Sequence, residues 1–312
     1  MSSFKGYYQA EPDGNPRIPR TFLLSRKNTL FIKNVGIPQT MKSLLLTLDC
    51  EEFVGRELGL DLDEQVAFEI GRKGFQIALG LLKKLGVKAT LFSTWTFAQY
   101  AEKEIAQAIA EGHELGLHGY EHHHRYATMP EGDAEALLKE AKEKMEKKFS
   151  VKIVSFRGPQ MSRPSYAVLE RIGIRYDSSY HPTYIPGHYN LFFKTRKIHR
   201  EGNVTVVPVS VTPLLRMPFS WIWLRNLPLA YAKVCTRLAL VDSNYLNLYF
   251  HPWEFVPLEG FRGKIPAIIV RKTGNPFLGK FENYLRWCVG LGLKPTTMKE
   301  FMEKEKSHEH TA

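Results

Sequence analysis

The chain has 312 residues, of which 44% are apolar, enough for one large or two small globular domains with a sizeable core. It carries 43 lysine and arginine residues against 32 aspartate and glutamate residues. This excess of positive charge favours an anionic partner such as nucleic acid, a phosphorylated glycan or an acidic membrane surface. The sequence has no basic run interleaved with aromatic residues, so we expect no nucleic-acid partner.

Cysteine usage and the amino terminus indicate the compartment. Cys50, Cys235 and Cys288 are too few and too widely spaced for a disulfide framework or a zinc finger, which favours a reducing environment. The first residues do not form a basic-then-apolar signal peptide, and no stretch has the uncharged length of a membrane-spanning helix. We therefore expect a cytoplasmic protein.

Strand and helix patterns alternate along the first half of the chain. Residues 1–41 are rich in proline, glycine, arginine and asparagine, and we expect an arm lying on the main domain. The pattern then predicts strands over residues 43–49, 87–93, 115–118 and 151–156, and helices over residues 64–85, 97–110 and 133–148. Alternation with short connections is typical of a parallel sheet or barrel.

The alternation of predicted strands and helices is less regular after Tyr176. Strands are predicted at residues 204–209 and 246–250, and a last helix at 280–289. Residues 211–228 hold two tryptophans and two arginines between prolines. We interpret this segment as an irregular excursion packed over the barrel; the alternative is a patch that contacts a membrane surface.

Four histidines lie within seven residues at the end of the third predicted strand. His118 and His122 are four residues apart, so a helical turn after Gly119 would place both imidazoles on one face. Imidazole nitrogens in this arrangement are good ligands for zinc and similar ions. A carboxylate from elsewhere would have to complete such a site. The alternative is a polar loop whose histidines only cap and solvate the chain.

Ionisable residues follow five predicted strands. In barrels of parallel strands, active groups lie at the carboxyl ends of the strands. Each of these residues has an easy structural explanation alone, but together they predict one active site. They are Asp49 with Glu51 and Glu52, His118 with His122, Arg157, Asp177, and His251.

The segments L-T-L-D-C-E-E-F, H-G-Y-E-H, F-R-G-P, Y-D-S-S-Y and H-P-W-E occur in the order of the motifs of a known family. Over residues 43–301 the chain resembles the polysaccharide deacetylases, carbohydrate esterases of family four. The resemblance implies an α/β fold, an irregular barrel of about seven strand–helix units with mainly parallel strands. It also implies a single catalytic domain over residues 42–303, between the arm at 1–41 and a disordered tail at 304–312.

The resemblance assigns roles to individual residues. Asp49 matches the catalytic base, Arg157 the arginine that orients it, and His251 the general acid, while Asp177 sits where an acid assists that histidine. His118 and His122 match metal ligands of one divalent ion, which we expect to be zinc. The substrate contacts expected near these motifs are Tyr120, Pro159, Tyr180, Trp253 and Trp221.

One departure concerns the third metal ligand. Many members have two adjacent acids in the first motif, whereas Cys50 follows Asp49 here. Because alternate residues of an extended chain share a face, Glu51 points with Asp49 and is our third ligand. Glu52 is the fallback.

The resemblance implies hydrolysis of an N-acetyl or N-formyl group on an amino sugar in a glycan, a lipid-linked or a nucleotide-linked substrate. The alternatives are an allantoinase-like small-molecule amidohydrolase and a catalytically inactive carbohydrate-binding barrel. The presence of both a base and an acid, Asp49 and His251, argues against the inactive barrel. A peripheral contact at the inner membrane face, through residues 219–229, and a homo-oligomer are further options.

Overall fold

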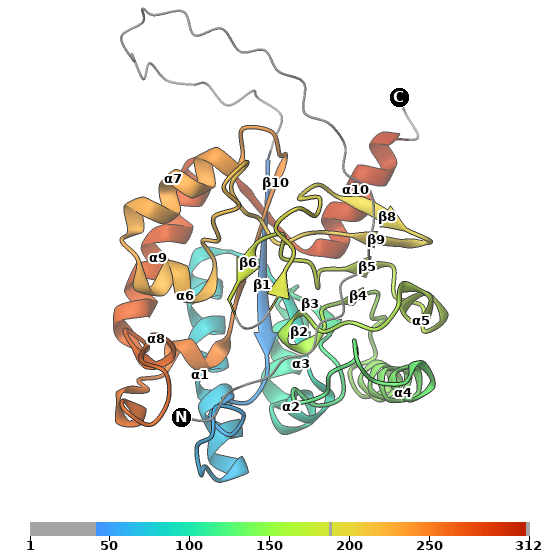
Figure 1. Ribbon diagram of the computed structural model, residues 1–312, viewed down its shortest axis with the longest axis horizontal. Helices are drawn as coiled ribbons and strands as arrows, with labels where there is room; N and C mark the ends of the chain where they lie inside the picture. Colours follow the sequence, from blue (N-terminus) through green and yellow to red (C-terminus); the bar gives the residue numbers. More distant parts are fainter. Residues whose placement is uncertain (1–41, 187–188, 310–312) are drawn as a thin grey trace, which may run out of the picture.

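The computed structural model describes residues 42–186 and 189–309. The predicted arm, residues 1–41, lies outside the described residues. The centre of the fold is a curled, mostly parallel sheet with helices around it (Figure 1), which confirms the predicted α/β barrel. Its strands lie in the order β10 (Tyr245–Phe250), β1 (Ser43–Cys50), β2 (Thr90–Ser93), β3 (Glu114–Leu117), β4 (Ser155–Phe156), β5 (Tyr176–Asp177), β9 (Val204–Val206) and β8 (His199–Glu201).

Two additions depart from a simple parallel sheet. β8 is antiparallel to β9, and β11 (Lys294–Thr296) pairs in parallel with the start of β1. A separate hairpin joins β6 (Tyr184–Ile185) and β7 (Tyr189–Asn190). Among the residues described, no helix combines the length and the apolar character needed to cross a membrane.

The side chains of β1 alternate between two packed faces. Leu44, Leu46 and Leu48 join the large core between the sheet and the outer helices. Leu45 packs instead in a second core on the inner face. Because successive side chains of a strand point to opposite faces, Asp49 belongs to the inner set. The amino-acid alternation of one buried strand thus directs this carboxylate toward the interior of the half-barrel.

Helix α1 (Glu64–Leu85) has the predicted bounds, because its ends carry strong local signals. The Asp63 side chain accepts hydrogen bonds from the N–H groups of Gln65 and Val66, and Gly86 ends the helix with a left-handed φ of 63°. The helix predicted at residues 97–110 is divided at Ala101 into α2 (Trp95–Tyr100) and α3 (Glu102–Ala110). The next helices are α4 (Glu131–Phe149) and α5 (Tyr166–Arg171).

The second half of the chain holds more helix than predicted. The predicted last helix is the inner part of α9 (Asn275–Gly290), and β11 and α10 (Met298–Glu309) follow it. The predicted tail is wrong for residues 304–309, which continue α10, while residues 310–312 lie outside the described residues. The remaining helices are α6 (Trp221–Asn226), α7 (Leu229–Ala239), α8 (Ala267–Val270) and the short 3-10 helices η1 (Pro159–Met161), η2 (Pro252–Phe255) and η3 (Glu259–Phe261).

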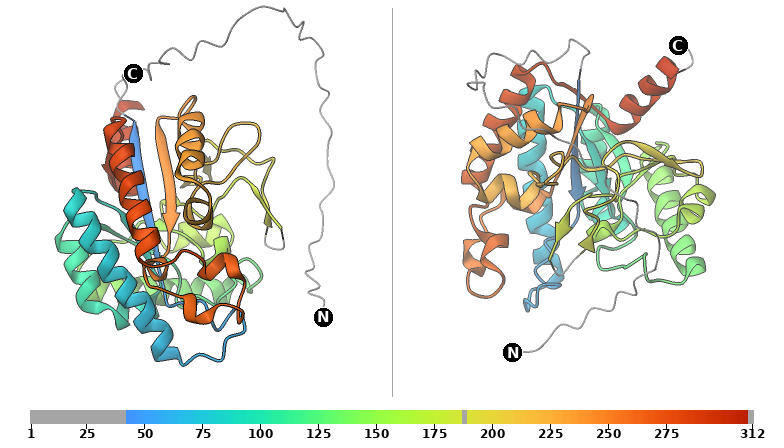
Figure 2. Two further views of the ribbon diagram at one scale, coloured as in Figure 1. Left: turned by 90° about the vertical axis from the view of Figure 1, so that its left-hand side faces the viewer. Right: turned by 45° about the horizontal axis from the view of Figure 1, so that its top comes forward.

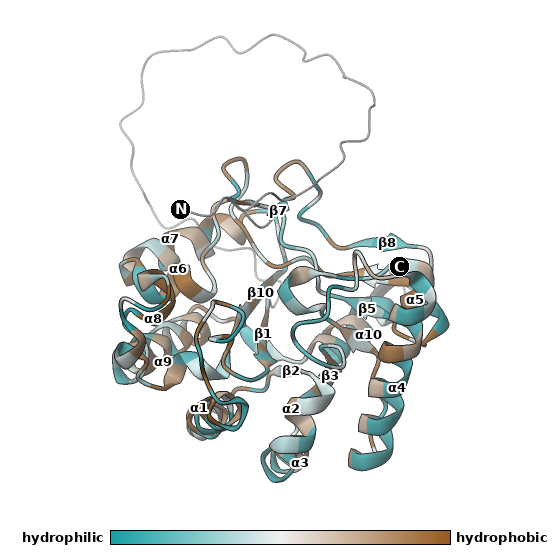
Figure 3. Ribbon diagram, turned by 60° about the horizontal axis from the view of Figure 1, so that its bottom comes forward, coloured by the Kyte–Doolittle hydropathy of each residue, from teal (hydrophilic) through white to brown (hydrophobic). Residues whose placement is uncertain are grey.

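The elements divide into two sides around β1 and β10. Figure 2 shows α1 on one side of these strands and the yellow-green segment between β5 and α6 on the other. The parallel register pairs Leu48 with Phe250 and Asp49 with Phe92, so β1, β10 and β2 end at one edge of the sheet. Figure 3 looks toward this edge, with the helices arranged around the strand ends.

Candidate active site

Three buried side chains at the carboxyl edge of the sheet form a group that could hold a metal ion. Oε2 of Glu51 lies 3.1 Å from Nε2 of His118 and 3.1 Å from Nε2 of His122. One ligand atom of each residue lies within 4.8 Å of the others. The histidines are brought together by bends and turns after β3, not by the helical turn that their spacing suggested. Glu51, rather than Glu52, is the carboxylate that reaches both imidazoles.

The second nitrogen of each imidazole has a partner that fixes the ring. Nδ1 of His118 lies 2.6 Å from the carbonyl oxygen of Arg157, and Nδ1 of His122 pairs with Oε1 of Glu57. An Nδ1–H that donates to these oxygens leaves Nε2 free to bind a metal ion. Arg125 and Gln160 also donate to Oε2 of Glu57. The orientation of His122 is therefore set by a carboxylate that is itself held in place.

The carboxylates around His122 favour positive charge at this place. Burial opposes a charged imidazole, but Glu51 and Glu57 raise the pKa of His122 to about 9. Burial also opposes a charged Glu57, but the hydrogen bonds from His122 and Arg125 lower its pKa to about 2. A cluster that stabilises a proton on His122 would also stabilise a metal cation. The donor set and its charge thus fit a divalent ion that takes nitrogen and oxygen ligands.

Asp49 forms a buried ion pair beside this group. Nη1 of Arg157 donates to Oδ1 of Asp49 at 2.7 Å and to Oγ1 of Thr47 at 2.6 Å. Burial by itself would raise the pKa of Asp49, but the positive charges of Arg157, His118 and His251 bring it below its usual value. Arg157 also donates to the carbonyl oxygen of Ser178, at 3.1 Å. The guanidinium is thus fixed from two strands and keeps Asp49 ionised.

His251 follows β10 and faces the same carboxylates. Its Nε2 lies 4.0 Å from Oδ2 of Asp49 and 3.9 Å from Oε1 of Glu51. Its Nδ1 lies 3.4 Å from Oε1 of Glu254, which also accepts the N–H of His251 at 3.0 Å. Burial opposes the imidazolium, but Glu254, Glu51 and Asp49 raise the pKa of His251 above its usual value.

Glu254 lies between His251 and Arg225 in a buried group of charged side chains that the sequence did not predict. Arg225 of α6 donates from Nη1 to Oε2 of Glu254, and both side chains are fully buried. The other guanidinium nitrogens of Arg225 donate to the carbonyl oxygens of Ile269 and Arg271, at 2.7 and 3.2 Å. The order His251, Glu254, Arg225 places a fixed negative charge behind the imidazole.

Asp177 lies elsewhere than predicted. Its Oδ1 accepts hydrogen bonds from the N–H and the hydroxyl of Ser179, at 2.9 and 2.5 Å, and Nε of Arg163 lies 3.9 Å from its Oδ2. Burial raises the pKa of Asp177. Among the described residues, the carboxylates paired with His251 are Asp49, Glu51 and Glu254. The structure therefore places Glu254, and not Asp177, beside this histidine.

The predicted substrate contacts divide into two sets. Trp253 stacks on His251 with ring centroids 5.0 Å apart, and its Nε1–H donates to Oε1 of Glu51 at 3.4 Å. The ring centroids of Trp221 and His251 lie 5.1 Å apart. Trp221 has a left-handed φ of 48°, which is rare for a bulky residue and marks a constrained position. The remaining three have no ring contact with His251 among the described residues. The hydroxyl of Tyr120 accepts a hydrogen bond from Nζ of Lys144, and the ring of Tyr180 packs against His199. Pro159 is the first residue of η1.

The residues missed by sequence reasoning lack a periodic signal. Glu57 lies in the connection between β1 and α1, and Arg225 belongs to the segment interpreted as an irregular excursion. Glu254 stands inside the quoted H-P-W-E motif, three residues after His251, and that spacing was the available hint. A glutamate three residues after a histidine at a strand end can turn back and contact that histidine.

The site combines a glutamate and two histidines with an ion-paired aspartate and a third histidine. Residues of these types, at the carboxyl edge of a barrel, are typical of metal-dependent hydrolases. The polysaccharide deacetylase family model matches residues 63–176, which include His118, His122 and Arg157. No curated protein sequence matches the chain. Over residues 63–176 the chain is similar to the polysaccharide deacetylases, the family that its motifs indicated.

Solved structures with the same fold extend over most of the chain. A protein from Mycobacterium smegmatis assigned as a polysaccharide deacetylase is 16% identical with a TM-score of 0.62, covering 87% of this chain and 93% of that chain. One from Pseudomonas aeruginosa PAO1, similarly assigned, is 16% identical with a TM-score of 0.59, covering 83% and 88%. The Puue allantoinase is 17% identical with a TM-score of 0.56, covering 83% and 88%. At these identities the likeness concerns the fold.

Proposed function

We propose that the protein is a metal-dependent hydrolase that removes an N-acetyl or N-formyl group from an amino sugar in a glycan, a lipid-linked or a nucleotide-linked substrate. The observation that carries this proposal is the placement of Asp49 and His251 beside the Glu51, His118 and His122 group, with Nε2 of His251 4.0 Å from Oδ2 of Asp49 and 3.9 Å from Oε1 of Glu51. A carbohydrate-binding protein has no need for a base and an acid beside a metal-binding group.

Glu51, His118 and His122 are the residues that would hold the ion, and their nitrogen and oxygen donors suit zinc. A divalent ion at this place supplies Lewis acidity, which polarises a carbonyl and activates water. Nδ1 of His118 is near the carbonyl oxygen of Arg157 and Nδ1 of His122 pairs with Glu57. The other nitrogen of each ring, Nε2, faces Glu51. The chain thus presents both rings in the orientation that a metal requires.

Asp49 is the general base in this proposal. A base must be ionised before it can accept a proton from the attacking water. Arg157 lowers the pKa of Asp49 and holds Oδ1, which leaves Oδ2 on the side of His251. Asp49 is therefore both charged and oriented before the substrate arrives.

His251 is the general acid. An amine leaves poorly as an anion, so the departing nitrogen needs a proton in the step that breaks the C–N bond. We assign Glu254 the assisting role that the family resemblance suggested for Asp177. Its negative charge, 3.4 Å from Nδ1, favours the imidazolium, and its Oε1 accepts the N–H of His251 and so holds the main chain. Trp253 and Trp221 offer aromatic faces beside the acid against which the apolar side of a sugar ring could lie.

A panel of substrates tests this proposal. Zinc-loaded protein is mixed with an N-acetylated oligosaccharide, a nucleotide-linked N-acetyl sugar, a lipid-linked N-formyl amino sugar and allantoin, and free amine, acetate and formate are measured. Amine release from a sugar, absent in Asp49→Asn, supports the proposal. Turnover of allantoin alone supports the allantoinase-like alternative. Binding of a sugar without release of amine at any metal loading would assign the inactive carbohydrate-binding barrel.

A further inference from the structure

Two loops expose large apolar side chains. Phe193 is 90% exposed, and Leu214 and Leu215 are 88% and 71% exposed. Exposing such side chains to water is unfavourable, and a contiguous exposed apolar patch commonly marks a site of interaction. We call these three residues the apolar tips.

The two loops are held together by hydrogen bonds. The N–H of Leu191 donates to the carbonyl oxygen of Thr183 at 2.9 Å, and the hydroxyl of Thr183 donates to the carbonyl oxygen of Arg216 at 2.7 Å. Leu191 lies two residues before Phe193, and Arg216 follows Leu215 directly. Thr183 therefore links the two loops that carry the apolar tips.

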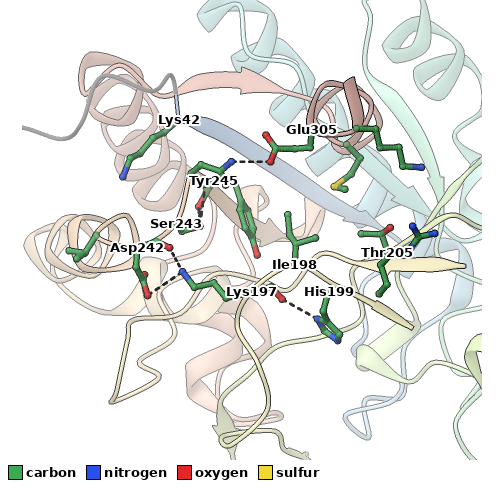
Figure 4. Close-up of a pocket in the computed structure, with 14 residues that line it drawn as sticks. Lys42, Lys197, Ile198, His199, Thr205, Asp242, Ser243, Tyr245 and Glu305 are labelled. Atoms are coloured by element: carbon green, nitrogen blue, oxygen red, sulfur yellow. Dashed lines mark hydrogen bonds and ion pairs between the residues drawn. The ribbon is translucent and has the colours of Figure 1, made fainter. Parts of the chain in front are cut away.

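A cavity of about 770 Å³ is lined by residues of β8, α10 and the start of β10, and by Lys197 (Figure 4). Its cationic lining residues are Lys42, Lys197, Arg200 and Lys306, and its acidic ones are Asp242 and Glu305. Asp242 pairs with Arg196 and Lys197, and Glu305 accepts from Asn244 at 3.1 Å, while Lys42 is buried and donates to the carbonyl oxygen of Leu240. The lining still holds four cationic side chains against two acidic ones. The cavity thus has an excess of positive charge.

The loop that carries Phe193 continues into the lining of the cavity. Lys197 lies four residues after Phe193, and the pairs of Arg196 and Lys197 with Asp242 fix this loop beside the cavity. Val241, which precedes Asp242, also lines the cavity and is 73% exposed. Apolar side chains are therefore exposed next to cationic ones.

The segment expected to contact a membrane is not suited to that role. Within residues 219–229, Phe219 and Arg225 are buried, Arg225 pairs with Glu254, and Trp221 packs against His251. These side chains pack in the interior or contact residues of the candidate active site. The exposed apolar tips lie instead in the loops before β8 and after β9.

We propose that the apolar tips and the adjoining cationic cavity form a docking surface for an anionic lipid bilayer, with Phe193, Leu214 and Leu215 inserted among the acyl chains and the cavity occupied by phosphate headgroups. Apolar insertion combined with basic residues at headgroup level is the usual basis of peripheral binding to acidic membranes. The net charge of +11 has the sign that this surface requires. Docking of this kind is independent of the proposed hydrolysis.

Sedimentation with vesicles tests the proposal. Full-length protein is mixed at 0.15 M salt with vesicles of pure phosphatidylcholine or of phosphatidylcholine with phosphatidylglycerol. We expect binding to the anionic vesicles. Because each basic side chain near an anionic surface strengthens binding about fivefold, the triple variant Lys197→Gln, Arg200→Gln, Lys306→Gln should weaken it on the order of 100-fold. The variant Phe193→Ser, Leu214→Ser, Leu215→Ser should weaken it roughly tenfold or more.

Two matched controls separate this surface from general electrostatic attraction. Lys103→Gln, Lys139→Gln, Lys147→Gln removes the same charge from exposed positions on α3 and α4, and Val289→Ser removes an exposed apolar side chain on α9. Both should bind like the natural protein. Failure of the natural protein to bind anionic vesicles, or equal losses in both lysine triples, overturns the proposal. Concentration-dependent self-association without vesicle binding, abolished by the serine triple, would assign the surface to a second copy of the chain and also overturn it.

Discussion

Gly74 of α1 packs against the carbonyl oxygen of Pro252 so closely that a Cβ on Gly74 would overlap it. Gly71, one turn earlier, has the same relationship with the carbonyl oxygen of Glu51. Glu51 is a proposed metal ligand, and Pro252 follows the proposed acid His251. Two glycines on one helix face therefore allow α1 to support both strand ends at once.

We expect Gly74→Ala to lower the free energy of unfolding by about 1–3 kcal/mol, because the added methyl group forces α1 away from η2. Turnover should fall as well, since His251 and Glu254 flank that contact. Urea denaturation and rates on one substrate measure both. Gly80→Ala is the matched control in the same helix: its Cβ meets nothing within 4 Å, so stability should rise by about 0.5–1 kcal/mol. Equal effects of the two changes would refute the packing explanation.

The proposed metal ligands can be tested by metal content. His118→Ala and His122→Ala should each abolish stable zinc binding, because the two remaining ligands hold an ion poorly. Glu51→Ala should weaken binding markedly, whereas Glu52→Ala should not, since Glu51 contacts both histidines. Glu57→Ala should lower affinity about 10–100-fold through the loss of the bond that orients His122. Zinc titration of the metal-free protein measures all five, and retention of zinc by Glu51→Ala but not Glu52→Ala would transfer the ligand role.

Asp49→Asn should leave zinc bound but lower turnover by a factor on the order of 100 to 10,000, the usual contribution of a positioned general base. Asp177→Asn is the matched carboxylate-to-amide change at another strand end. It should cost much less activity, because Asp177 bonds Ser179 and not the proposed acid. Metal content and turnover are measured on the same preparations. A loss in Asp177→Asn as large as that in Asp49→Asn contradicts these assignments.

His251→Ala should lower amide turnover far more than turnover of an aryl ester. An amine must be protonated as it leaves, whereas an activated phenolate leaves without a proton. Both substrates are followed at the same pH with zinc-saturated enzyme. Equal losses on the two substrates would mean that His251 binds the substrate or supports the structure.

Glu254→Gln should move the alkaline limb of the pH–rate profile to lower pH. The rate falls as His251 loses its proton, and the negative charge of Glu254 raises the pKa of His251, so its removal lowers that pKa. The variant should also be destabilised by about 3–5 kcal/mol, because Arg225 would remain buried without an acid.

The double variant Arg225→Gln, Glu254→Gln separates the two effects of that change. Removing both charges should restore part of the stability lost in Glu254→Gln, while the alkaline limb stays shifted. pH–rate profiles and thermal unfolding measure the two properties independently. An unshifted alkaline limb in a folded Glu254→Gln protein would show that Glu254 is structural only.

Local patterns determined much of this protein. The bounds of α1 follow from its apolar periodicity together with Asp63 and Gly86 at its ends, so they could be predicted from sequence. The alternation along β1 likewise predicted that Glu51 would share the side of Asp49, and Glu51 is the acid that contacts His118 and His122. These signals act over a few residues, so they need no knowledge of the remainder of the fold.

Tertiary structure alone decided which residues support the site. Glu57 reaches His122 across 65 positions of sequence, from the connection between β1 and α1, and Arg225 of the short helix α6 reaches Glu254 across 29. The same holds for the loops that carry Phe193 and Leu214, which Thr183 links by hydrogen bonds. Hydrogen bonds between distant side chains depend on how the loops close over the sheet. Periodicity records which face of an element is buried, and it carries no information about the partner that buries it.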